Sequence, residues 1–169
     1  LGLSDVEGLV CFAPALWNGR DAILKERLFG LGNPEGNHGE DIKDTMYHLA
    51  GTPTCSYAKA LYRYPQAAFP YQHLRDENRR RSRDEKEYEL VDTGIFSDNR
   101  FFDMEVEYAK ADAEDLFIRL TITNQSDESS ELHLLPSLWY RNTWSWGDRR
   151  ANRPSLHLQG DSLVSEAID

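Results

Sequence analysis

The sequence predicts a mainly β protein, an antiparallel β-sandwich with long loops and one to three short helices. Residues 102–109 and 118–123 alternate apolar and polar side chains with a period of two, which indicates half-buried strands. Residues 132–140 also alternate, but they carry apolar side chains in both phases. An antiparallel sheet with one apolar face must bury that face on a second layer, so we expect a sandwich.

The second half of the chain gives the clearest element boundaries. Polar turn-forming segments follow the first two strands at 111–115 and 124–130. In the third strand Leu135 and Trp139 oppose the main apolar phase, so we expect both faces of this strand to be covered. Pro136 cannot donate to a ladder and indicates a bulge or a sheet edge. Residues 155–159 and 162–165, separated by Gly160-Asp161, indicate a hairpin.

The first half is less regular. Residues 9–16 are apolar enough for a buried strand, and residues 71–81 are predicted to be helical. Residues 41–49 and 58–64 each allow a helix or a strand, and residues 21–30 allow a short helix or a long loop. These segments are rich in aromatic side chains, which we interpret as a docking surface for another part of the protein: Tyr47, Tyr57, Tyr62, Tyr64, Phe69 and Tyr71.

Length and composition set the broad class. With 169 residues, the chain is expected to form one domain over residues 1–169. The net charge of −10 argues against a nucleic-acid partner, because an acidic surface repels phosphates. No apolar stretch is long enough to cross a membrane, so no membrane partner is expected. Two cysteines do not make a disulfide framework, which predicts a cytoplasmic location.

Both ends of the chain predict a piece of a longer protein. The sequence starts at Leu1 without a methionine and ends at Asp169 next to a strand-like segment. We therefore expect the domain to be incomplete at both ends.

A candidate cleft loop lies at Asn37, His38, Glu40 and Asp41, which bring an imidazole and two carboxylates within five residues. One reading is a general acid/base pair or part of a cation site. The other is that Glu40 and Asp41 are the acidic first turn of a helix and that His38 is an ordinary loop residue. Adjacent carboxylates rarely face each other across a sugar, which favours the second reading.

A candidate carbohydrate-binding segment has the densest aromatic cluster, with Trp139, Arg141, Asn142, Trp144 and Trp146. Indole faces stack on sugars, and the Arg and Asn side chains can supply hydrogen bonds. The alternative is that the tryptophans plug a sheet edge or pack on a neighbouring domain.

The motifs of common catalytic sites are absent from the sequence. The histidines have no HExxH spacing, no serine lies in a GxSxG elbow, and no Walker or Rossmann glycine pattern occurs. Beyond the candidate cleft loop, the sequence therefore offers no motif that assigns a catalytic residue, a metal or a cofactor.

Eight short blocks along the chain have motif-like sequences: residues 15–21 (ALWNGRD), 23–31 (ILKERLFGL), 34–41 (PEGNHGED), 64–71 (YPQAAFPY), 78–81 (NRRR), 92–94 (DTG), 108–111 (YAKA) and 138–146 (LWYRNTWSW). Together they resemble the N-terminal region of large bacterial glucosidase-like proteins related to glycoside hydrolase family 63. In that family an N-terminal β super-sandwich precedes an (α/α)6 barrel that carries the acid and base carboxylates.

The resemblance implies a non-catalytic accessory domain of an inverting, α-glucosidase-like hydrolase. Such a domain would shape or stabilise a C-terminal catalytic barrel and border a carbohydrate cleft. Its expected partners are that catalytic domain and, through the parent enzyme, a carbohydrate substrate. Two alternatives stay open, an autonomous carbohydrate-binding module and a purely structural interdomain domain.

Overall fold

The computed structural model describes residues 2–25, 45–146 and 154–165. These residues form two compact units. The first takes in the described residues of 1–2 and 13–137, and the second takes in those of 3–12 and 138–169.

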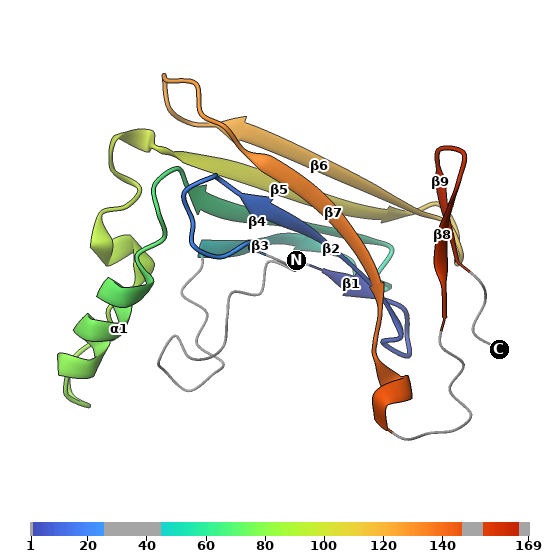
Figure 1. Ribbon diagram of the computed structural model, residues 1–169, viewed down its shortest axis with the longest axis horizontal. Coiled ribbons are helices and arrows are strands. Elements are labelled where there is room, and N and C mark those ends of the chain that lie inside the picture. The colour runs from blue at the N-terminus through green and yellow to red at the C-terminus, as the bar shows by residue number, and fades with distance from the viewer. Residues whose placement is uncertain (1, 26–44, 147–153, 166–169) are drawn as a thin grey trace. The chain divides into compact units, whose positions relative to one another are not determined.

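Most of the regular structure is β-strand (Figure 1). The strands are β1 (Leu3–Ser4), β2 (Val10–Trp17), β3 (Thr45–Gly51), β4 (Tyr57–Pro65), β5 (Phe101–Lys110), β6 (Leu116–Asn124), β7 (His133–Tyr140), β8 (Leu156–Gln159) and β9 (Ser162–Ser165). They form three sheets, with the orders β1-β2-β7, β3-β4-β5-β6 and β8-β9. The described helical segments are α1 (Tyr71–Arg80) and short 3-10 turns at Leu90–Thr93, Ser97–Asn99 and Thr143–Trp146.

The four-stranded sheet is the framework of the first unit. Its strands lie side by side in an antiparallel ladder, in which Tyr62 pairs with Met104 and Met104 pairs with Ile122. Directly paired residues share one face of a sheet. The apolar residues of β4, β5 and β6 therefore gather on one side, which explains why residues 58–64 form a strand and not a helix.

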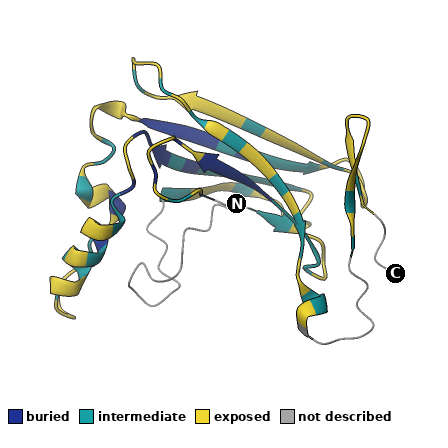
Figure 2. Ribbon diagram, viewed as in Figure 1, coloured by how far each residue is buried: buried dark blue, intermediate teal, exposed yellow. Residues whose placement is uncertain are grey.

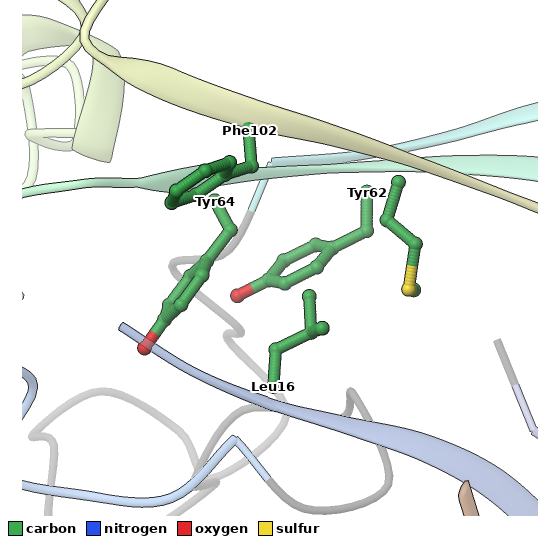
Figure 3. Close-up of a cluster of buried hydrophobic side chains, with 5 residues drawn as sticks. Leu16, Tyr62, Tyr64 and Phe102 are labelled. Atoms are coloured by element: carbon green, nitrogen blue, oxygen red, sulfur yellow. The ribbon is translucent and has the colours of Figure 1, made fainter. Parts of the chain in front are cut away.

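The core lies between this sheet and the β2 and β7 segments of the same unit. Leu16 of β2 packs against Tyr62, Tyr64, Phe102 and Met104, all of which are buried (Figure 3). Further apolar side chains extend the contact from β3 and the β7 region: Met46, Leu132 and Leu134. Burying each large apolar side chain contributes about 1.5–3 kcal/mol, so this cluster holds the two layers together.

The other face of the four-stranded sheet carries charged ladders. Arg63 makes two hydrogen bonds to the Asp103 carboxylate, at 2.8 and 2.9 Å. The Glu107 carboxylate accepts hydrogen bonds from the Tyr57 hydroxyl at 2.7 Å and from Arg119 at 2.6 Å. These two donors lower the pKa of Glu107 below its ordinary value. The paired charges keep this face compatible with water.

Helix α1 packs through a second, smaller apolar cluster. Leu74 is its buried residue and contacts Phe69 and Leu90. The helix follows Pro70, and Arg79 and Arg80 in its last turn complement the negative end of the helix dipole.

The second unit contains the β1 pairing and the β8–β9 hairpin. Leu3 of β1 pairs with Phe12 of β2, and the β8–β9 hairpin turns at Gly160, whose φ is +61°. In the same unit the Arg141 N–H donates to the Leu9 carbonyl at 2.8 Å.

The structure confirms the mainly β class and the antiparallel sheets. It also confirms a strand within residues 9–16, the helix at 71–81 and the hairpin near Gly160. Pro136 lies in β7, an edge strand of its sheet, as the sequence predicts. The single domain, incomplete at both ends, stays a prediction.

One expectation about the aromatic residues is wrong. Tyr62 and Tyr64 are fully buried in the core, so they cannot dock another domain. The rings of Tyr62 and Tyr64 lie between β4 and Leu16, which belongs to the layer that faces β4 in the same unit (Figure 3).

Candidate functional site

The loop that follows β2 is held in place by several buried side-chain hydrogen bonds, and Asn18 organises it. The Asn18 amide oxygen accepts from the N–H groups of Arg20 and Asp21, at 2.9 and 2.7 Å. Its amide nitrogen donates to the carbonyls of Pro65 and Ala67, at 2.7 and 2.9 Å. Asn18 therefore closes its own turn and ties the turn to the end of β4. Gly19 has a φ of +73°, which glycine adopts without strain.

Asp21 is a buried carboxylate with three donors. The Tyr64 hydroxyl donates to Oδ2 at 2.9 Å, and the Tyr71 hydroxyl donates to Oδ1 at 2.8 Å. The Ile23 N–H also donates to Oδ1, at 3.0 Å. A buried charge costs little only when it is hydrogen-bonded in this way, so Asp21 joins the loop to β4 and to the start of α1.

Lys25 completes this buried cluster. Its backbone forms both hydrogen bonds of a bridge to Leu16, at 3.2 and 3.0 Å. Its ammonium group lies 3.6 Å from the centroid of the Phe69 ring and 4.8 Å from that of Tyr71. Such cation–π contacts stabilise a desolvated ammonium group.

The polar side chains of this cluster hold the loop in place. Its polar side chains Asn18, Asp21 and Lys25 are nearly inaccessible, and both Asp21 oxygens are occupied by donors. The cluster fixes the turn after β2, and with it the orientation of Trp17.

Trp17 presents an aromatic surface at the end of β2. Its indole N–H donates to the Asp21 carbonyl at 3.0 Å, and its ring lies 5.2 Å from the ring of His133 on β7. Leu135 follows two residues later in β7 and so shares the face of His133. Trp17 is 37% exposed and Leu135 is 44% exposed. We call Trp17, His133 and Leu135 the outer-face patch, since Leu16 and Leu134 point to the core.

The predicted carbohydrate-binding residues lie in the second unit. Trp139 and Trp144 are half-buried, whereas Arg141 and Asn142 are exposed. The Asn142 carbonyl accepts a hydrogen bond from the Ser145 hydroxyl at 3.0 Å. Trp146 ends a 3-10 turn. Carbohydrate binding by this segment stays a prediction.

The predicted cleft loop, Asn37, His38, Glu40 and Asp41, lies outside the described residues. Among the residues that are described, no group of three or more His, Cys, Asp or Glu side chains could hold a metal ion.

Sequence reasoning missed the positional role of Asn18 and Asp21. The signal was present in Asn18-Gly19-Arg20-Asp21, because asparagine followed by glycine and aspartate is typical of a side-chain-closed turn. Nothing local to that turn pointed to its partners Tyr64 and Tyr71, which lie more than forty residues further along the chain.

A comparison with curated proteins finds a relative in yeast. The chain is 46% identical over 172 residues to the uncharacterized protein YMR196W of Saccharomyces cerevisiae. The match covers 95% of this chain but only 16% of the yeast protein. No family model matches the chain, and no solved structure matches it.

The yeast relative overturns the resemblance to bacterial glucosidase-like proteins. A match at this identity, over almost the whole chain, is to a eukaryotic protein whose name states no activity. The identification as a bacterial glucosidase-like protein is therefore wrong, and no comparison supports an accessory role in a glycoside hydrolase. Two of those blocks, 15–21 and 64–71, have a physical explanation instead, because they contain Asn18, Asp21, Tyr64 and Tyr71 of the buried cluster.

Two further observations concern membrane-spanning helices and the cysteines. No helix in the described ranges is long and apolar enough to span a membrane. Cys11 and Cys55 are both free thiols.

Proposed function

We propose that this chain is a non-catalytic β-sandwich module that docks on another part of a longer protein. The outer-face patch is the docking surface. The sequence of β7 predicts that both of its faces are covered. The observation that carries the proposal is that Leu135, on the outer face, is instead exposed beside the aromatic pair of Trp17 and His133.

The length of the relative supports another segment of the same polypeptide as the occupant. The chain spans about a sixth of the yeast protein, 16%, so most of that protein lies outside the matched region. An apolar patch beside a rigid loop is a typical site for contact between domains. The buried cluster of Asn18 and Asp21 pre-organises Trp17, which lowers the entropic cost of docking.

The test compares one substitution in two contexts. Leu135→Lys in the isolated chain adds a charge to a half-exposed position, so its thermal midpoint should change little. In the longer protein the same lysine would be buried against the docked segment, and the midpoint should fall by several degrees. Thr123→Lys, on the charged face of the four-stranded sheet, is the matched control and should be neutral in both contexts. Equal effects of Leu135→Lys in both contexts would refute the docking role.

Carbohydrate binding is the second candidate, and the exposed indole of Trp17 is the observation that favours it. An indole beside an imidazole can stack on a sugar face. Titration with a panel of α-glucans should then quench tryptophan fluorescence in the wild-type chain and less in Trp17→Leu. A flat response across the panel would remove this candidate.

A cytoplasmic location belongs to the same proposal. It is supported by the two free thiols, since secreted domains of this size more often pair their cysteines.

A further inference from the structure

We propose that β6 is a self-association edge, through which two copies of this chain pair β6 with β6 in antiparallel orientation about a twofold axis at Leu120. This proposal goes beyond the docking role and uses a different surface.

Within the part of the chain that the structure describes, β6 is an unprotected edge strand. It is the last strand in the order β3-β4-β5-β6, runs over nine residues, and contains no proline. Its pairing with β5 is regular from Leu116 to Asn124. The opposite edge differs, because β3 has an irregular register between His48 and Ala50. Bulges and charges commonly protect edges from pairing, and β6 has no bulge and Arg119 as its one charged residue.

The phase of the hydrogen bonds shows which backbone groups of β6 point outward. Beyond its two ends the β5–β6 ladder continues with Gln125 N–H to Phe101 carbonyl, at 3.0 Å, and Ala111 N–H to Asp115 carbonyl, at 2.9 Å. Hydrogen-bonded and non-hydrogen-bonded pairs alternate in an antiparallel ladder. Odd-numbered residues of β6 therefore face β5, and the N–H and C=O groups of even-numbered residues such as Leu120 face outward.

The same even-numbered residues carry the apolar side chains. Ile122 pairs with Met104 and Leu120 with Val106, so they lie on the core face of the sheet. Ile118 and Ile122 are nevertheless each 36% exposed, and Figure 2 shows most of β6 as exposed, in contrast to the buried part of β5. The outer edge thus offers backbone donors and acceptors together with uncovered apolar side chains.

A second copy fits this edge because the residues within two positions of Leu120 make compatible pairs across a twofold axis. With the axis at Leu120, Leu120 meets the Leu120 of the second copy, and Ile118 meets its Ile122. On the other face Arg119 meets Thr121, so no two like charges are opposed, and Arg119 already pairs with Glu107 in its own copy at 2.6 Å. The two four-stranded sheets would join into one eight-stranded sheet, and their apolar faces would become continuous. Because the pairing uses the free β6 edge of each copy, assembly stops at the dimer.

The expected dimer is weak. Pairing of single edge strands buries little surface compared with the roughly 1,600 Å² of a stable interface. The net charge of −10 on each copy also opposes association, so added salt should strengthen it.

The first test is a cross-link that reports the register. In a background with Cys11→Ser and Cys55→Ser, Leu120→Cys places the two thiols in a directly opposed pair, within disulfide reach. Thr121→Cys, one residue away and on the other face, is offset from its copy by two residues and is the matched control. The proposal predicts disulfide dimers of Leu120→Cys at several times the yield of Thr121→Cys. Equal yields, or a higher yield for Thr121→Cys, would overturn the axis at Leu120.

The second test does not depend on a cysteine variant. Sedimentation of the wild-type chain up to about 1 mM should show a mass that rises with concentration and levels off at the dimer. Ile122→Lys should abolish the rise by placing a charge on the apolar edge, whereas Thr123→Lys, on the other face, should leave it. A monomer at every concentration, which would leave the edge to some other occupant, or growth beyond the dimer would each overturn the proposal.

Discussion

The Tyr64 hydroxyl donates a 2.9 Å hydrogen bond to the Asp21 carboxylate, and both side chains are buried. This bond joins the turn after β2 to β4 in the facing layer of the same unit. It explains why a tyrosine, with its polar tip, occupies a position at the centre of an apolar core.

Removing this donor should destabilise the fold. Tyr64→Phe keeps the ring but leaves Oδ2 of Asp21 without its tyrosine partner, at a cost of about 1–3 kcal/mol in the free energy of unfolding. Urea unfolding measures the cost. Tyr71→Phe serves as the comparison, because Tyr71 donates to the other oxygen of the same carboxylate. The double variant should depart from additivity, and strict additivity would contradict a shared network.

Replacing the buried Asn18 should cost more stability than replacing an exposed asparagine such as Asn142. Asn18→Ala removes four hydrogen bonds that close the turn and tie it to the carbonyls of Pro65 and Ala67. We expect a loss of about 2–3 kcal/mol, because buried partners are left unsatisfied. Asn142→Ala, at an exposed position, is the control and should stay within about 0.5 kcal/mol of wild type. Comparable losses in the two variants would argue against the turn as an organising element.

The core cluster predicts a contrast between two strands. Met104→Ala on β5 should cost about 2–5 kcal/mol, because it opens a cavity beside Tyr62 and Leu16. Phe117→Ala on β6 removes a larger side chain that is 63% exposed and should cost much less. Thermal or urea unfolding of both variants checks the contrast. A larger loss for Phe117→Ala would mean that the core lies elsewhere.

The charged face predicts a dependence on acid. Hydrogen bonds from Tyr57 and Arg119 lower the pKa of Glu107 below its ordinary 4.5. The folded state therefore binds the proton less readily than the unfolded state. The resulting stabilisation is present above about pH 4.5 and is lost as the pH falls through the lower, folded-state pKa.

Glu107→Gln tests this assignment. Its stability should fall less steeply than that of the wild type between neutral pH and strongly acidic pH, as measured by urea unfolding at a series of pH values. Glu128→Gln, whose carboxylate lies at a longer distance, 3.8 Å, from Arg100 and is well exposed, is the control. Parallel pH profiles for wild type and Glu107→Gln would show that the Tyr57–Glu107–Arg119 contacts contribute nothing.

Elements that a local pattern determines could be predicted from the sequence, whereas elements that depend on distant pairing could not. β5 and β6 could be predicted because alternation is a local pattern that one apolar face imposes on each strand. Residues 58–64 could not be assigned, since their strand conformation depends on pairing with β5 residues that lie 38 to 50 positions further along the chain.

The candidate site was less accessible from sequence. Tyr64 and Asp21 look unrelated until the fold brings them together. The aromatic content of the first half wrongly predicts Tyr62 and Tyr64 to be docking residues, because burial depends on the facing layer. The motif-like blocks resemble an enzyme family, although the buried cluster accounts for two of them through structure alone. Chemistry-bearing motifs and structural turns use the same residue types, so short blocks do not distinguish them.

Hydroxyl-radical footprinting of the outer-face patch tests the docking role most directly. In the isolated chain, Trp17, His133 and Leu135 should be oxidised at rates that match their exposure. In the longer protein the same three residues should be protected together, while Phe117 on β6 should stay reactive unless copies of the protein associate through that edge. Unchanged oxidation of Trp17 and Leu135 in the longer protein would contradict the proposal that this face docks another domain.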